Sequence, residues 1–352
     1  MQTQCNPIQM EFAEVERRRV VAAFDGGTVS SDGGALLLAR TDEAIGLTDR
    51  LAGCFRDRRA PALVEHAVRT LVGQRVFGIA AGYEDLNDHD ELRKDPLWGA
   101  LMGKLTAKRR DCQALAGKST LNRLEWARAN GTTRYQRIEL DSDAIERLFV
   151  ALFLDAHAAA PEEIVLDLDA TDDPLHGNQE GRFFHGYYDH YCYLPLYIFC
   201  GRHLLCAKLR PANIDGAAGA KEEVTRIVGQ IRARWPETRI ILRADSGFAR
   251  EGLMAWCEGN GVDYVFGLAR NRRLERWLQP TLERVAEQVA VRGQAAREFL
   301  ETSYRTLTSW SCARRVVGKA EVTTLGSNPR FVVTSLSVQA WDARALYEDL
   351  YC

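Results

Sequence analysis

The pattern of apolar and polar positions changes near residue 160. Before that point apolar residues recur at helical spacing, most clearly from Ala60 to Gly78, where Pro61 occupies a first helical position. Beyond it, short apolar runs alternate with helical stretches. The pattern therefore predicts two regions, a mostly helical region over residues 1–155 with a short irregular entry, and an α/β domain over residues 156–352.

Three predicted strands open the second region: EIVLDLD, YCYLPLYIFC and HLLCAKLR. The tight turn Gly201-Arg202 joins the last two, so we expect a meander. The remaining expected elements are a helix after Asp215 that Pro236 stops, the strand RIILRAD, a helix over Glu251 to Glu258, the strand VDYVFGLA, a helix from about Arg272 to Val289, strands within residues 297–336 and a last helix in WDARALYEDLYC.

Two features of the N-terminal region could bind anions. Asp-Gly-Gly repeats at Asp25 and Asp32 ahead of an apolar helix start; turns are the simplest interpretation and a phosphate cradle is the alternative. The basic clusters RDRR (56–59) and KLTAKRR (104–110) accompany a capped helix that we expect to begin near Ser119. Together they favour a small helical DNA-binding region, with solvated charged faces as the alternative.

Composition narrows the class of protein. The 352 residues carry a net charge of −2 and are 46% apolar, enough for two cores, so any nucleic acid must be bound by local basic clusters. No run approaches the about 18 apolar residues of a membrane span, and no signal peptide opens the chain. The nine cysteines lack a Cys-x-x-Cys pair. We expect a cytoplasmic protein with reduced thiols and no membrane partner.

Four aspartates crowd the end of the first strand, in IVLDLDATDDPLHG. Because alternate residues of a strand share a face, Asp167 and Asp169 point together while Leu166 and Leu168 face the core. Carboxylates this close raise each other's pKa unless a cation compensates them. Mg²⁺, which prefers oxygen ligands, is the natural compensating ion.

Three interpretations of this strand end compete. It could be a solvated acidic turn. Asp-x-Asp-x-Thr also resembles haloacid-dehalogenase-type phosphatases, a resemblance that would make Asp167 the nucleophile and Asp169 the general acid. Alternatively, Asp245 in RIILRADSGFAR ends a second buried strand. If that strand joins the free side of the first, Asp169 and Asp245 become neighbours that could hold two Mg²⁺ ions about 4 Å apart for attack on a phosphodiester.

A family resemblance is carried by five segments, in this order: DLDATDDPLHGNQEG, RFFHGYYDHYCYLPLYIFCG, LRPANIDGAAGAKEE, ILRADSGFAR and DYVFGLARNRRLE. They closely resemble bacterial insertion-sequence transposases of the DDE type, in particular the group whose type element is numbered thirteen-eighty. The resemblance runs from FDGGTVSSDGGALLL to the last residue. It implies an RNase H-like mixed sheet flanked by helices, with a β-rich insertion at about 295–336, after an N-terminal region that binds DNA ends.

The resemblance also implies the chemistry. Asp169 would be the first catalytic acid and Asp245 the second, both as ligands of Mg²⁺ or Mn²⁺, and Asp167 would be a neighbour. The metals would activate a water to nick the element ends and then a DNA 3′-hydroxyl to attack the target strand. The partners would be the terminal inverted repeats, target DNA and a second copy of the chain in a synaptic complex.

Two further groups of residues could contact DNA: Arg270, Asn271, Arg272 and Arg273 after the fifth strand, and Tyr187 and Tyr188 in the second segment. The basic cluster could hold phosphates, and a solvated helix start is the alternative. The two tyrosines could stack on an unpaired base, whereas core packing explains the chain's other tyrosines more simply.

The resemblance implies a third acid on the helix after the insertion, in the pattern Tyr, two residues, Arg, three residues, Glu, and later Lys. Tyr351 matches the tyrosine, so the arginine, glutamate and lysine would lie beyond Cys352. Glu348 is nearby but precedes Tyr351. We therefore expect a truncated transposase that binds metal weakly and cuts DNA poorly or not at all. A DNA-binding remnant and a fragment without function are the non-enzymatic alternatives.

Overall fold

The chain divides into two compact units, Met1–Leu148 and Phe149–Cys352. The computed structural model describes residues 10–23, 31–128 and 133–352. Helix α7 (Ser142–Asp155) begins in the first unit and ends in the second. The division expected after residue 155 falls at the C-terminal end of this same helix.

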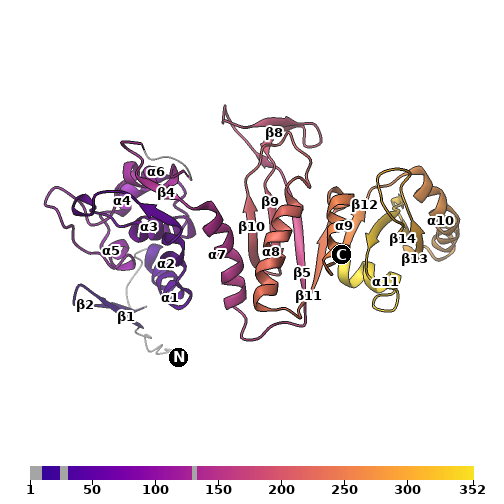
Figure 1. Ribbon diagram of the computed structural model, residues 1–352, viewed down its shortest axis with the longest axis horizontal. Coiled ribbons are helices and arrows are strands. Elements are labelled where there is room, and N and C mark those ends of the chain that lie inside the picture. The colour runs from indigo at the N-terminus through magenta and orange to yellow at the C-terminus, as the bar shows by residue number, and fades with distance from the viewer. Residues whose placement is uncertain (1–9, 24–30, 129–132) are drawn as a thin grey trace, which may run out of the picture. The chain divides into compact units, whose positions relative to one another are not determined.

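The described part of the first unit is mostly helical, as predicted (Figure 1). Its elements are β1 (Met10–Val15), β2 (Arg18–Ala22), α1 (Ala35–Ile45), α2 (Leu47–Ala52), β3 (Phe55–Asp57), α3 (Val68–Ala80), α4 (His89–Leu92), α5 (Pro96–Leu101), α6 (Lys118–Glu125) and β4 (Ile138–Leu140). The prediction of an irregular entry is wrong for residues 10–22, where β1 and β2 pair as an antiparallel hairpin, and residues 1–9 lie outside the described residues. Asp25 lies outside the described residues.

The helix predicted over residues 60–78 begins later than its sequence pattern indicates. Pro61 starts only a single 3-10 turn, Pro61–Leu63, and α3 begins at Val68. Between them the Glu65 carboxylate accepts hydrogen bonds from Lys104 Nζ at 2.6 Å and from two backbone amides of the 104–110 loop. These contacts hold the segment in a conformation that a continuous helix could not reach.

Helix α6 also differs from its prediction in how it begins. It starts at Lys118, and its N-cap is Gly117, which has no side chain to accept a hydrogen bond. The side chain of Asp90 accepts one from the Lys118 amide instead, at 3.2 Å. A residue from a different helix thus does part of the work of an N-cap.

The second unit is an α/β domain (Figure 1). Its elements after α7 are β5 (Glu163–Ala170), β6 (Asp173–Pro174), β7 (Phe183–His185), β8 (His190–Tyr193), β9 (Leu196–Cys200), β10 (His203–Lys208), α8 (Ala220–Arg234), β11 (Arg239–Ala244), α9 (Glu251–Gly259), β12 (Asp263–Leu268), α10 (Arg272–Arg292), β13 (Ala296–Tyr304), β14 (Arg314–Thr323), β15 (Gly326–Ser327), β16 (Arg330–Thr334), α11 (Ala343–Ala345) and a π-helix (Leu346–Tyr351).

The predicted single strand YCYLPLYIFC is two strands. Pro195 separates β8 from β9, because a proline has no N–H to donate to a sheet. Strand β8 pairs with β6 and β7 in a small sheet of its own, and Figure 1 shows it beyond the end of β9. We call this small sheet and its turns, residues 171–195, the β-arm.

The described residues form one nine-stranded sheet whose main path runs β10-β9-β5-β11-β12-β16-β14-β13. The predicted meander of β5, β9 and β10 is confirmed, and β11 joins the free side of β5 in parallel. The first five positions have the strand order of an RNase H-like fold. The strands of the 295–336 insertion do not form a separate layer, because β16 pairs with β12 and extends the same sheet.

Helices cover both faces of this sheet, because side chains alternate along its strands. On β11, Ile240 and Leu242 belong to the core beneath α7, α8, α9 and α10. Ile241 faces the other way and packs with Leu346 and Leu350 of the C-terminal helix. None of the described cysteines forms a disulfide. Among the described helices, none is long and apolar enough to cross a membrane.

Candidate active site

Asp169 and Asp245 lie side by side at the carboxyl ends of two neighbouring strands. In the parallel pair β5 and β11, Leu168 is opposite Ala244, and each aspartate directly follows its partner in that register. Carboxyl ends of adjacent parallel strands are a common position for ligand-binding side chains. The strand order thus brings together the two acids that the sequence places 76 residues apart.

The pair is electrostatically unfavourable without a cation. Partial burial of its carboxyl, and then the charge of Asp245, raise the pKa of Asp169. A divalent cation relieves such repulsion, and carboxylate oxygens are the ligands that Mg²⁺ prefers. Within the described residues, however, no group of three or more histidine, cysteine or acidic side chains could hold a metal. The two aspartates therefore fit a divalent ion as part of its ligand set.

The Asp167 side chain lies on the same strand face as that of Asp169, but its carboxylate is already paired with an arginine. Arg243 donates from Nε and Nη2 to its two carboxylate oxygens, at 2.5 and 3.0 Å. A phosphoryl-accepting nucleophile needs a free oxygen, so this ion pair disfavours the phosphatase interpretation. Arg243 was not among the residues predicted for the site. The signal available for it was an arginine within an apolar strand, two positions before Asp245.

The C-terminal helix lies beside this site. A Cβ atom on Gly267 of β12 would lie 2.6 Å from the Tyr351 hydroxyl and 2.8 Å from the Ser246 amide. Tyr351 therefore covers β12 next to the turn that presents Asp245. Burial, and then the charge of Asp245, raise the pKa of Tyr351.

Glu348, the acid nearest to the expected third position, points elsewhere. It pairs with Arg297 Nε at 2.7 Å and with Arg344 Nε at 2.8 Å. Arg297 belongs to β13 and Arg344 to α11, so the carboxylate is directed along the insertion strands. The structure does not bring Glu348 to the aspartate pair.

The two tyrosines of the β-arm have different environments. Tyr188 is half-buried and donates a long hydrogen bond, 3.5 Å, to the Ala170 carbonyl. Its pKa is raised by burial and then by the charges of Asp172 and Asp169, so it lies near the acids. Tyr187 packs edge-on against Tyr188 and is 85% exposed. Tyr187 is thus the one with a free ring face.

The residues of the basic cluster after β12 also differ in their environments, because some have structural partners and others are exposed. Because β12 runs parallel to β11, the cluster follows the same sheet edge as Asp245. Asn271 caps α10 by accepting from the Arg273 and Leu274 amides. Arg273 donates to the Arg305 carbonyl at 3.0 Å. Arg270 and Arg272 are exposed, and no described residue forms an ion pair or a hydrogen bond with either side chain.

The Asp-Gly-Gly repeat at Asp32 has a structural role in the first unit. The Asp32 carboxylate accepts from Tyr83 Oη at 3.1 Å and from Trp98 Nε1 at 3.2 Å, so this Asp-Gly-Gly repeat anchors core side chains. It does not form a phosphate cradle.

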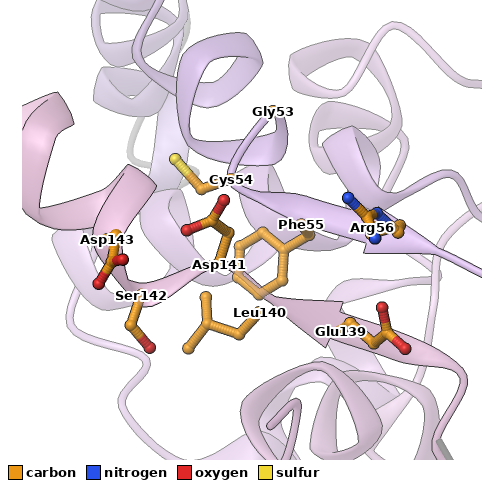
Figure 2. Close-up of a pocket in the computed structure, with 9 residues that line it drawn as sticks. All are labelled: Gly53, Cys54, Phe55, Arg56, Glu139, Leu140, Asp141, Ser142 and Asp143. Carbon is orange, nitrogen blue, oxygen red and sulfur yellow. The ribbon is translucent and has the colours of Figure 1, made fainter. Parts of the chain in front are cut away.

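A cavity of about 400 Å³ lies between β3, β4 and the start of α7 (Figure 2). Two of its three acids have structural partners: Glu139 pairs with Arg58, and Asp141 accepts from the Ala144 amide at the start of α7. Burial, and then the charge of Asp141, raise the pKa of the Cys54 thiol, which makes it a poor nucleophile. The cavity belongs to the first unit, whereas the aspartate pair belongs to the second.

Comparison with known proteins places the chain in a family. Residues 12–352 match the family described as Transposase DDE domain group 1. No curated protein matches the chain. Among solved structures, the cryo-EM structure of a piggyBac transposase synaptic complex with hairpin DNA is similar over 86% of this chain, with 12% sequence identity and a TM-score of 0.37. The chain spans 61% of that structure's length.

Proposed function

The family match covers residues 12–352, so the chain belongs to the DDE transposase family, and we propose that it is the transposase of a bacterial insertion sequence. The observation that carries the proposal is the Asp169–Asp245 pair, two acids at adjoining strand ends with the pKa of Asp169 raised. The five sequence segments quoted above support the insertion-sequence group. The substrates would be the terminal inverted repeats of the element and a target DNA.

In this proposal Asp169 and Asp245 are ligands of Mg²⁺ or Mn²⁺. Such an ion, when bound, stabilises the negative charge that develops on a phosphodiester under attack. The two carboxylates supply hard oxygen donors, and their mutual repulsion favours a bound cation. Asp167 stays outside the ligand set and, through Arg243, joins the two strands that carry the acids.

We further propose that catalysis needs an acid from outside the described residues. Asp169 and Asp245 have no third ligand among those residues, and Glu348 is held by Arg297 and Arg344. The 352-residue chain should then bind metal weakly and cut DNA poorly. A transposase remnant that binds DNA without cutting it is the second candidate function, favoured by the position of Glu348.

The exposed groups around the acids would contact DNA. Arg270 and Arg272 follow the same sheet edge as Asp245, and Tyr187 presents an exposed ring on the β-arm. Guanidinium groups bind phosphates, and an exposed aromatic ring can stack on an unpaired base. The resemblance to insertion-sequence transposases supports a homodimer in a synaptic complex and a cytoplasmic location.

A cleavage assay tests the proposal. The substrate is DNA that carries the terminal inverted repeats, and the protein is the chain extended by a helix with the expected arginine, glutamate and lysine. We expect Mg²⁺-dependent nicking that Asp169→Asn and Asp245→Asn abolish. Asp173→Asn, which removes an exposed charge beyond the same strand, should keep it. Metal-dependent nicking that survives both active-site substitutions would contradict the proposal.

Parallel assays separate the remaining alternatives. Strong nicking by the 352-residue chain, lost in Asp169→Asn, would contradict only the need for an additional acid. A gel shift at two salt concentrations distinguishes a DNA-binding remnant from a fragment without function, because phosphate contacts give a steep salt dependence.

A further inference from the structure

Two adjoining cavities on the first unit form a surface that the catalytic proposal does not use. The smaller, of about 200 Å³, is the arginine pocket, and it is lined by Arg59, Arg123, Arg134, Arg137, Tyr135 and Thr120. The larger, of about 810 Å³, is the aromatic groove. It shares Arg123 and Tyr135 with the pocket, and its other lining residues include Trp126, Ser119, Asn122, Gln136, Lys118 and Asp85, whose carboxylate accepts from the Asn87 amide. Helix α6 and the segment before β4 supply most of these side chains.

The arginine pocket has uncompensated positive charge. Arg59 is neutralised by Asp57, which accepts from its Nε and Nη2 at 2.8 and 2.7 Å. Arg123, Arg134 and Arg137 are exposed, and no described carboxylate pairs with any of the three. Guanidinium groups that converge on one small cavity suit an anion with several oxygens, above all a phosphate, which they bind through paired N–H donors.

The aromatic groove offers open ring faces next to that pocket. Tyr135 is 69% exposed and Trp126 is 54% exposed, although aromatic rings of this size are usually buried. Arg134 lies 5.8 Å from the Tyr135 ring centre, and Arg128 lies 5.9 Å from the Trp126 ring centre. Rings that carry a cation on one face are well suited to stack a nucleobase.

An arginine pocket next to an aromatic groove favours a strand with unpaired bases over a duplex. A duplex presents phosphates, but its bases are stacked on each other and offer only their edges. An unpaired strand alternates phosphates with free base faces, which matches a phosphate pocket that shares Tyr135 with an aromatic groove. The polar groups of Ser119, Asn122 and Gln136 can bind the edges of such a base.

We propose that this surface binds an unpaired stretch of DNA, with a phosphate in the arginine pocket and an adjacent base stacked on Tyr135 or Trp126. The inference rests on the proposed function for the identity of the strand as DNA. It adds to that function a second DNA site, in the first unit, that recognises strand separation and not duplex sequence.

Fluorescence anisotropy tests the proposal on the 352-residue chain. The probe is a fluorescein-labelled 12-nucleotide single strand, compared with the same strand annealed to its complement. We expect Arg123→Gln, Arg134→Gln and Arg137→Gln each to weaken single-strand binding about fivefold and to lower the salt slope by about 0.7. Tyr135→Ala and Trp126→Ala should each weaken it about tenfold and leave duplex binding unchanged, and Tyr135→Phe should bind like the wild type.

Arg18→Gln is the matched control, because Arg18 is an exposed arginine of the same unit outside both cavities and outside the basic clusters at 56–59 and 104–110. It should bind within about twofold of the wild type. Thermal unfolding of each variant checks that the first unit is intact, and Tyr135→Phe keeps the test of stacking valid if Tyr135→Ala unfolds. Wild-type affinity in all three arginine variants, or equal losses for single strand and duplex in Tyr135→Ala, would overturn the proposal.

The same variants separate this inference from the proposed function. If the arginine variants bind normally while nicking still depends on Asp169, the surface proposal fails and the transposase proposal stands. If the surface binds single strands but nicking does not depend on Asp169, the opposite holds.

Discussion

Arg243 joins strand β5 to the C-terminal helix, because its side chain donates both to Asp167 of β5 and to the Leu350 carbonyl of the helix. Its Nε and Nη2 hold the Asp167 carboxylate, while Nη1 donates to the Leu350 carbonyl at 2.7 Å. Leu350 immediately precedes Tyr351, which lies beside Asp245. One guanidinium thus links both strands of the candidate site to the helix on which the family resemblance implies the third acid. Arg243 is a positioning residue and not a metal ligand.

The substitution Arg243→Lys tests this role. A lysine cannot reproduce three donors in a planar fork, so the carbonyl of Leu350 or one oxygen of Asp167 loses its partner. We expect the free energy of unfolding to fall by about 1–2 kcal/mol. We also expect faster hydrogen exchange at the amides of residues 346–351, measured by mass spectrometry.

Arg239→Lys is the control for this prediction. Arg239 lies on the same strand and donates to Glu163 and Asp263, and within the described residues it forms no hydrogen bond with the C-terminal helix. It should leave exchange in residues 346–351 unchanged. Equal exchange in the two variants would show that Arg243 does not position the helix.

Gly267 is expected to be essential to the arrangement around Asp245. In Gly267→Ala the new Cβ would lie 2.6 Å from Tyr351 Oη and 3.1 Å from the Asp245 carbonyl carbon, and a backbone atom cannot move without shifting the turn. We expect a loss of about 1–3 kcal/mol in unfolding free energy, measured by urea denaturation. The extended chain should also lose metal-dependent nicking.

Gly229→Ala is a matched glycine substitution in α8, where a Cβ meets nothing within 4 Å. Alanine has the higher helix propensity, so this variant should be more stable by up to about 1 kcal/mol. A Gly267→Ala variant as stable as the wild type would contradict the close packing of Tyr351 against β12.

Strand order and the meeting of Asp169 with Asp245 were predictable because they depend on local patterns. Apolar runs mark the strands, and a meander followed by a crossover leaves only the free side of β5 for β11. The start of α3 at Val68 was not predictable, since the contacts of Glu65 that delay it come from a loop about 40 residues away. The break at Pro195 could have been predicted, because a proline within an apolar run argues against one continuous strand.

The contact between Arg243 and Leu350 was beyond sequence reasoning for a related reason. The two residues are 107 positions apart, and their approach depends on the C-terminal helix packing on the sheet face opposite α8. Periodicity predicts that helix and its apolar stripe. It does not predict which face the helix covers, and so it does not predict that the Leu350 carbonyl reaches Arg243.

The lowered pKa of Glu65 predicts that the first unit loses stability in acid. Burial alone would raise its pKa, but hydrogen bonds from Lys104 and from the Lys108 and Arg109 amides lower it from 4.5 to about 2. A carboxyl whose pKa is lower in the folded state stabilises the fold above its unfolded pKa and loses that contribution as the pH falls. The contribution, about 3 kcal/mol, should therefore be complete above about pH 4.5 and lost towards pH 2.

Urea denaturation of wild type and Glu65→Gln at several pH values measures this contribution. The variant should be less stable at pH 7, and the difference should shrink as the pH falls from 4.5 to 2. Glu91→Gln is the control, because Glu91 is an exposed carboxyl of the same unit whose side chain is 79% exposed. A constant difference between wild type and Glu65→Gln across this pH range would contradict the assignment.

The aspartate pair should lower stability when no metal is bound. Since Asp169 and Asp245 repel each other, Asp169→Asn removes a repulsion, and we expect the metal-free variant to be more stable by about 0.5 kcal/mol, a modest gain because the site is open to solvent. Added Mn²⁺ should stabilise the wild type by mass action and should not stabilise the variant. Thermal unfolding with and without Mn²⁺ measures both effects, with Asp173→Asn as the charge-matched control. An Asp169→Asn variant that responds to Mn²⁺ as strongly as the control would exclude Asp169 as a metal ligand.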